Sequence, residues 1–114
     1  QALLPLLQKA ESASIIFTSS GVGREAKPNW GAYAVSKFAT EAMMQLFSSE
    51  LSELSPNIRA NAINPGATRT NMRASAYPEE NPDTLATTEE IMPLYLYLMG
   101  KDSIGTNGQS INAQ

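Results

Sequence analysis

Apolar and polar residues follow one another in blocks that predict strands and helices in turn. Residues 14–19 form a continuous β-branched and aromatic run, which is typical of a strand covered on both faces in a parallel sheet. Residues 58–64 and 108–113 are predicted to be two further short strands. Helices are predicted over residues 1–9, 32–54 and 88–99.

The order of these elements predicts an α/β fold. Strands that alternate with helices pair in parallel through right-handed crossovers. In such sheets, ligands bind outside the carboxyl ends of the strands. Ser20 and the Pro65-Gly66 pair both follow predicted strands, so we expect them to lie at the same edge of the sheet.

The predicted helix over residues 32–54 carries an unusually wide apolar stripe. A stripe of this width predicts that the helix is buried on two faces, one against its own sheet and one against another subunit. We therefore expect a homodimer or homotetramer that assembles through this helix. The stripe comprises Val35, Phe38, Ala39, Ala42 and Leu46, widened by Met43 and Phe47.

Residues 67–88 are long, polar and proline-containing, with Pro78 and Pro82. A loop of this length inside a compact domain is usually functional, often a lid. The sequence leaves room for a short helix within it.

Composition limits the classes of partner. The 114 residues correspond to about one small domain, and 42% hydrophobic with 17% charged residues indicates a folded protein. The net charge of −3 argues against nucleic acid as a partner, and no apolar run approaches the roughly 20 residues of a membrane span. Cysteine and histidine are both absent, so we expect no metal site and a cytoplasmic setting.

Candidate chemistry centres on Tyr33 and Lys37, which are four residues apart and therefore share a helix face. A lysine ammonium beside a tyrosine phenol favours the phenolate, which makes the phenol a usable proton donor and acceptor. Ser20, thirteen residues before Tyr33, offers a hydroxyl that can hold a substrate oxygen. The pair alone is a common accident, so further motifs have to support it.

Three segments supply that support and resemble the second half of a short-chain dehydrogenase/reductase. They occur in the family's order and spacing, and Gly108-Gln109 precedes the last strand as it does in the family. The resemblance covers essentially the whole chain and implies a Rossmann-like, three-layer parallel sheet. The segments are residues 16–21, 33–37 and 64–70.

The resemblance also implies an activity. The family consists of NAD(P)-dependent oxidoreductases acting on small carbonyl or alcohol substrates, so the implied cofactor is NAD or NADP. By this resemblance Tyr33 is the catalytic acid and base, Lys37 supports it and binds the nicotinamide ribose, and Ser20 polarises the substrate oxygen. Residues implied to bind the cofactor are Tyr33, Lys37, Pro65, Gly66, Thr68 and Thr70.

One departure from the family concerns the dinucleotide pyrophosphate. The family binds the pyrophosphate with a glycine-rich turn that opens a helix, and this sequence contains no such turn. Gly21-Val22-Gly23 does not qualify, because it follows the catalytic strand and precedes a loop. The chain also begins at Gln1, within an apolar helical pattern. We therefore expect residues 1–114 to be the carboxyl-terminal, catalytic part of a Rossmann-type domain. Without the dinucleotide-binding part, we expect it to be inactive and its first strand to present an unpaired edge.

Several alternatives remain open at this point. The parent protein is alternatively a non-catalytic oligomerising module on the same fold, or a family isomerase or epimerase. Ser19 is interpreted as a backbone cap, and Arg69 and Arg73 as arginines that are solvated or pair with nearby acids and lie outside the site. Trp30 either walls the substrate pocket or covers a subunit contact.

Overall fold

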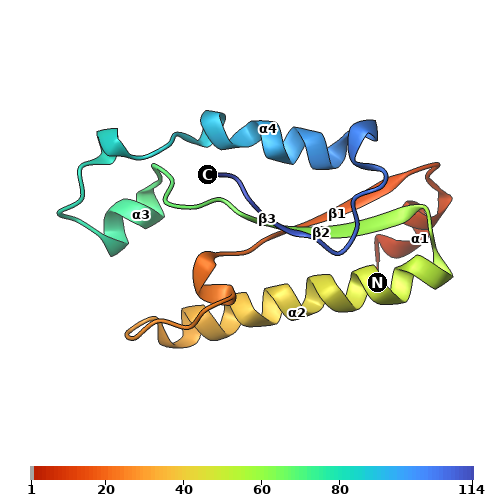
Figure 1. Ribbon diagram of the computed structural model, residues 1–114, viewed down its shortest axis with the longest axis horizontal. Helices are drawn as coiled ribbons and strands as arrows, with labels where there is room; N and C mark the ends of the chain where they lie inside the picture. Colours follow the sequence, from red (N-terminus) through yellow and green to blue (C-terminus); the bar gives the residue numbers. More distant parts are fainter. Residues whose placement is uncertain (1) are drawn as a thin grey trace.

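The computed structural model describes residues 2–114 and has three layers, with a parallel sheet between two helices (Figure 1). Strands β1 (Ala13–Thr18), β2 (Ile58–Asn64) and β3 (Ser110–Asn112) lie side by side in that order. Helix α2 (Gly31–Leu54) covers one face of the sheet and helix α4 (Thr88–Met99) covers the other. The predicted α/β fold with a three-layer parallel sheet is confirmed.

Element bounds agree closely with the predictions. Strand β2 and helix α4 have the predicted bounds, while α2, β1 and β3 differ by one or two residues at an end. The helix predicted over residues 1–9 begins at Leu4 among the described residues, and Gln1 lies outside them. The predicted loop over 67–88 contains one short helix and one 3₁₀ turn. The short elements are α1 (Leu4–Lys9), α3 (Asn71–Ala76), η1 (Gly21–Gly23), η2 (Pro82–Thr84) and η3 (Lys101–Ser103).

Strand β2 is the centre of the sheet and is buried on both faces. Ala60, Ala62 and Ile63 have no exposed surface, as expected for a parallel strand under two helical layers. Residue Thr18 of β1 lies opposite Ile63 of β2. The two strands therefore end together, and the segments that follow them start side by side.

Helix α2 turns a different face to the sheet from the one that its apolar stripe predicts. Val35 and Leu46 of the stripe are 70% and 58% exposed. The prediction that this stripe packs on the sheet is wrong for all of its residues except Phe47, and its contact with another subunit stays a prediction. The buried residues of α2 are Ala34, Glu41, Met44 and Leu51.

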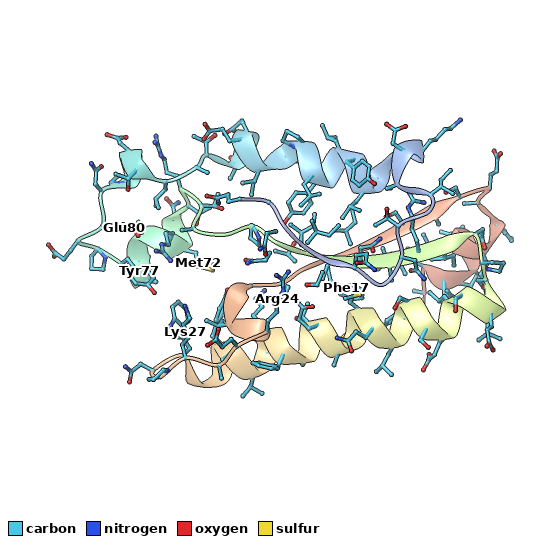
Figure 2. All side chains as sticks on the ribbon, viewed as in Figure 1. Phe17, Arg24, Lys27, Met72, Tyr77 and Glu80 are labelled. Carbon is cyan, nitrogen blue, oxygen red and sulfur yellow. The ribbon has the colours of Figure 1, made fainter. Side chains whose placement is uncertain are left out.

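Glu41 explains the error. Its carboxylate is nearly buried, and Arg24 Nε donates to it over 3.3 Å while Ser110 Oγ donates over 2.7 Å. A buried carboxylate is tolerated when charged and polar groups satisfy it. The pairing places a charged residue on the covered face, where a hydrophobicity pattern predicts an apolar one. Further along the helix, Phe47 packs on Phe17 of β1 with ring centroids 5.9 Å apart. Figure 2 labels Phe17.

Helix α4 begins with a capping box. The Thr87 hydroxyl accepts from the Glu90 backbone N–H, and the Glu90 carboxylate accepts from the Thr87 N–H. Glu89 also lies in the first turn, where negative charge is favourable. Across residues 2–114, no helix has both the length and the apolar character needed to cross a bilayer.

Arg59 is a buried cation that joins three elements. It is 5% exposed, and its guanidinium donates to neutral oxygens only in the part of the chain that the structure describes. Two of the acceptors are backbone carbonyls at the end of α4, where the helix dipole favours positive charge. The acceptors are Ser12 Oγ, Ser103 Oγ and the carbonyls of Ala13, Leu98 and Gly100.

Replacing this arginine tests how much the network stabilises the fold. We predict that Arg59→Met lowers the free energy of unfolding by about 3 kcal/mol, because it leaves several buried acceptors without donors. Guanidinium denaturation of the protein measures the change. Arg69→Met is the matched control, since Arg69 pairs with exposed Asp83 over 3.5 Å and such surface pairs contribute about 0–1 kcal/mol. Equal losses in the two variants would contradict the structural role of Arg59.

Candidate active site

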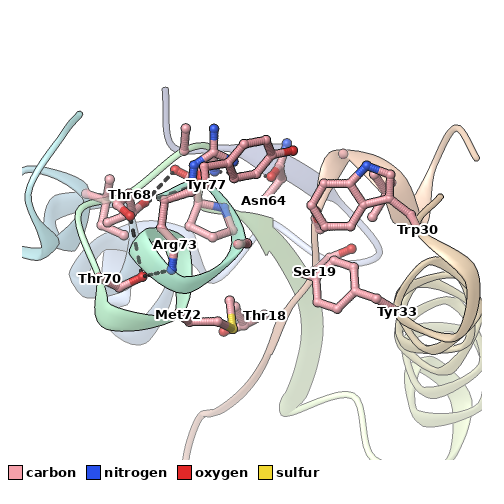
Figure 3. A pocket seen from close by; sticks show the side chains of 18 of the residues that line it. Thr18, Ser19, Trp30, Tyr33, Asn64, Thr68, Thr70, Met72, Arg73 and Tyr77 are labelled. Carbon is pink, nitrogen blue, oxygen red and sulfur yellow. Dashed lines mark hydrogen bonds between the residues drawn. The ribbon is translucent and has the colours of Figure 1, made fainter. Parts of the chain in front are cut away.

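A cavity of about 650 Å³ opens where strands β1 and β2 end. Its walls come from the end of β1, the start of α2, the loop after β2 and helix α3 (Figure 3). Lys37 is not part of the wall but lies one helical turn behind Tyr33. The predicted site residues that line the cavity are Ser20, Tyr33, Pro65, Gly66, Thr68 and Thr70.

Tyr33 and Lys37 occupy neighbouring positions on α2, as their spacing predicts. The Lys37 Nζ lies 5.6 Å from the centre of the Tyr33 ring. The same Nζ donates a hydrogen bond of 2.9 Å to the backbone carbonyl of Thr18, the last residue of β1. This bond fixes the ammonium between the strand end and the tyrosine.

The two serines after β1 have different surroundings. Ser20 is half-buried and lines the cavity just before the η1 turn. Ser19 is 2% exposed, and its Oγ has no hydrogen-bond partner among residues 2–114. The interpretation of Ser19 as a backbone cap is therefore wrong. A buried hydroxyl without a partner is unusual and calls for a water molecule or a ligand.

The loop after β2 is held in shape from both sides. The Gly66 N–H donates to Asn64 Oδ1 over 3.1 Å, and the Gln114 amide donates to the Pro65 carbonyl over 2.6 Å and to the Ala67 carbonyl over 3.1 Å. Gly66 has a φ of +75°, a conformation that glycine adopts without strain. A Cβ there would lie 2.8 Å from the Gln114 amide nitrogen.

Thr68 and Thr70 line the cavity, but their hydroxyls also bond within the loop. Thr68 Oγ1 donates to the Gly66 carbonyl over 3.3 Å. Thr70 Oγ1 accepts from the Arg73 N–H and so caps helix α3. Both threonines therefore shape the loop in addition to any contact with a ligand.

An aromatic wall that the sequence did not predict in full closes one side of the cavity. The Trp30 ring lies 5.3 Å from that of Tyr33 and 6.1 Å from that of Tyr77, centre to centre. These contacts join the start of α2 to the segment after α3 (Figure 3). Trp30 lines the cavity, and its contact with another subunit stays a prediction. Tyr77 was missed, although an aromatic residue in a polar loop was a usable signal.

Arg69 and Arg73 pair with acids, as the sequence predicts. Arg73 makes two hydrogen bonds of 2.6 and 2.7 Å to the carboxylate of Glu80, and Arg69 lies 3.5 Å from Asp83. The hydrogen bonds from Arg73 hold the pKa of the Glu80 carboxyl below its usual range, and they raise the pKa of Arg73. The Arg73–Glu80 pair joins α3 to the segment that follows it.

A polar network connects the segment that follows β1 to the edge strand β3. Besides Glu41, Arg24 donates to Ser110 Oγ over 3.0 Å and to Asn112 Oδ1 over 2.7 Å (Figure 2). The Asn64 amide donates to the same Asn112 oxygen over 3.1 Å. The network therefore links the segment after β1 to the loop after β2 through β3.

Comparison with known proteins identifies the family. The family model for short chain dehydrogenases matches residues 1–81. The Escherichia coli K12 protein called "uncharacterized oxidoreductase YciK" is 57% identical over 114 residues, which are all of this chain and 44% of that protein. The chain therefore belongs to the short chain dehydrogenase family.

Solved structures agree with this assignment. A short chain dehydrogenase from Salmonella enterica serovar Typhi has 58% identity and a TM-score of 0.95, over 100% of this chain and 46% of that one. A Shigella flexneri 2a protein solved in complex with NADP has 57% identity and a TM-score of 0.95, with the same coverage. These matches confirm the predicted Rossmann-like arrangement. The chain spans less than half the length of these relatives.

Acidification is expected to loosen α3. The pKa of Glu80 lies below its ordinary value of 4.5, so the stabilisation from its pairing is fully present above that value. It is lost as the pH falls through the lowered, folded-state pKa; Arg73 stays charged throughout. Hydrogen exchange of residues 71–84 between pH 7 and 3, corrected for intrinsic rates, measures this loss.

The control for this prediction is a pair of amide variants. Glu80→Gln should show at pH 7 the weakened protection that the wild-type protein shows only in acid. Asp83→Asn, which removes the exposed partner of Arg69, should keep wild-type protection. Full protection of α3 in Glu80→Gln at pH 7 would show that the pair does not hold this segment.

Proposed function

We propose that this chain forms the catalytic part of an NADP-dependent oxidoreductase that interconverts a carbonyl and an alcohol. The observation that carries the proposal is that Ser20 and Tyr33 line one cavity, with the Lys37 ammonium directly behind Tyr33, in a member of the short chain dehydrogenase family. The NADP complex of the Shigella relative supports the choice of cofactor. A small carbonyl or alcohol is the proposed substrate.

The residues around the cavity fit the nicotinamide end of such a cofactor. Ser19 offers a buried hydroxyl without a partner among the described residues. Lys37 uses one of its three donors on Thr18, which leaves donors to offer to a ribose hydroxyl. The Pro65-Gly66 segment of the loop after β2 also lines the cavity. We place the glycine-rich turn for the pyrophosphate in a part of a longer protein outside this chain.

The proposed mechanism assigns one task to each side chain. The bound cofactor supplies or accepts the hydride. In the reducing direction, the Tyr33 hydroxyl donates a proton to the substrate oxygen, and in the oxidising direction the phenolate takes it back. The Lys37 ammonium offers donors to the nicotinamide ribose, and the Ser20 hydroxyl donates a hydrogen bond to the substrate oxygen. Trp30 and Tyr77 keep water from one side of the cavity.

Removing the phenolic hydroxyl tests the central role. We predict that Tyr33→Phe in the longer protein lowers kcat for carbonyl reduction by about 10² to 10⁴-fold, because general acid catalysis contributes that much. NADPH binding, followed by cofactor fluorescence, should remain. Tyr97→Phe is the matched control, since the Tyr97 hydroxyl bonds Thr106 and lies outside the cavity wall.

Three outcomes of this experiment bear on the proposal. Undiminished turnover in Tyr33→Phe would remove Tyr33 from the mechanism. Absence of NADPH binding in the wild-type protein, with intact oligomers, would favour a non-catalytic module. Proton exchange without net oxidation would favour an isomerase or epimerase. The 114-residue chain alone is expected to give no turnover.

We also propose that the longer protein is a homodimer or homotetramer built through residues 32–54. The support is the exposed stripe on α2, in which Val35, Phe38 and Leu46 point away from the sheet. An apolar stripe of this kind gains stability when another copy of the same helix covers it.

A single charge on the stripe tests this assembly. We predict that Leu46→Glu dissociates the oligomer, because the carboxylate would be buried without a partner. Sedimentation velocity measures the mass. Gln45→Glu adds the same charge at the next, exposed position on the flank of the stripe and should leave the assembly intact. Unchanged mass in Leu46→Glu would exclude this helix as the interface.

A further inference from the structure

Arg73 and Tyr77 form a partition between two cavities. Both residues line the large cavity beside Tyr33, and both line a second cavity of about 320 Å³ between α3 and η2. Glu80 lines the second cavity and not the first. In Figure 2, Tyr77 and Glu80 lie at this end of the molecule with Met72 nearby. The orientation of Arg73 and Tyr77 therefore determines which of their side-chain groups are exposed in each cavity.

The charge of Arg73 is satisfied from the second cavity. Its Nε and one terminal nitrogen donate to the two oxygens of Glu80, which is the strong, bidentate form of the contact. Its guanidinium carbon also lies 3.8 Å from the centre of the Tyr77 ring, which restricts the plane of the group further. Both contacts hold the cation in place, so it is not free to turn toward the large cavity.

The remaining wall of the large cavity is almost uncharged. Among the described residues that line it, the ionisable cations are Lys27 and Arg73, and there is no carboxylate. Lys27 is exposed at the cavity, where water screens its charge. The rest of the wall combines uncharged polar residues with an aromatic and aliphatic part, which includes Trp30, Met72, Ala76, Tyr77 and Ile91.

We propose that Glu80 is a specificity-determining residue that keeps Arg73 away from the substrate, so that the enzyme selects uncharged, ring-bearing carbonyls over carboxylated ones. This inference rests on the proposed function. An uncharged ring matches the apolar wall of Trp30, Met72 and Tyr77. A carboxylate placed against this apolar part of the wall loses water, and the one lining cation without a carboxylate partner among the described residues, Lys27, is exposed and screened. Without the Glu80 charge, Arg73 becomes available to pair with such a carboxylate.

A matched pair of aldehydes tests the proposal in the longer protein with NADPH. Benzaldehyde and 4-carboxybenzaldehyde share the reacting group and the ring and differ in one charge. We expect the wild-type protein to prefer benzaldehyde in kcat/KM. Glu80→Gln is expected to shift the preference toward the carboxylated aldehyde by about tenfold or more, mainly through KM.

Two further variants separate charge from loop stability. Glu80→Asp keeps the charge and should restore the wild-type preference. Asp83→Asn makes the same acid-to-amide change in the same segment, but its partner Arg69 lies outside the large cavity, so the preference should not change. Loosening of α3 alone would lower kcat/KM for both aldehydes together and leave their ratio unchanged.

The outcomes distinguish this inference from the function beneath it. An unchanged ratio in Glu80→Gln, or a wild-type preference for the carboxylated aldehyde, overturns the role of Glu80. Failure to reduce benzaldehyde by a protein that reduces other carbonyls with NADPH overturns the ring-bearing substrate class. Failure to bind NADPH at all overturns the proposed function itself.

Discussion

The rest of the structure depends on the burial of strand β2, which is covered on both faces and paired along both edges. Its polar side chains cannot reach water, so they bond to neighbouring segments. Arg59 binds the end of α4, and Asn61 binds the segment before β3 by donating to the Thr106 carbonyl and accepting from the Gln109 N–H. The strand therefore holds together the segments at the amino-terminal end of the sheet without itself contributing a proposed catalytic residue.

Local signals predicted most of the fold. Strand β2 and helix α4 have the bounds that their sequences indicate, because α4 carries a capping box at Thr87 and ends at Gly100, and proline-containing turns delimit β2. The cavity residues were also predictable, since Ser20 and Gly66 follow adjacent parallel strands whose carboxyl ends meet at one edge. The first inference needs only local sequence, and the second adds only the general rule that parallel strands end at one edge of a sheet.

The errors have a common physical cause in contacts between distant segments. The buried face of α2 includes Glu41, whose burial is possible because Ser110, 69 residues away in sequence, donates to it. The pattern of apolar positions within a helix does not indicate which distant residue will pair with it. The place of Tyr77 in the wall depends in the same way on Trp30, which lies on a different element.

The ion pairs explain why a single lysine can matter to the chemistry. Arg24 and Arg73 both lie near the cavity, and each is neutralised by a carboxylate, Glu41 or Glu80. Lys37 instead donates to a backbone carbonyl, so its full positive charge remains. An ammonium paired with a carboxylate would present little net field to the nearby phenol. Among the described residues, Lys37 therefore keeps a positive charge without a carboxylate partner beside the Tyr33 ring, whereas Lys27, which also lines the cavity, is exposed and screened by water.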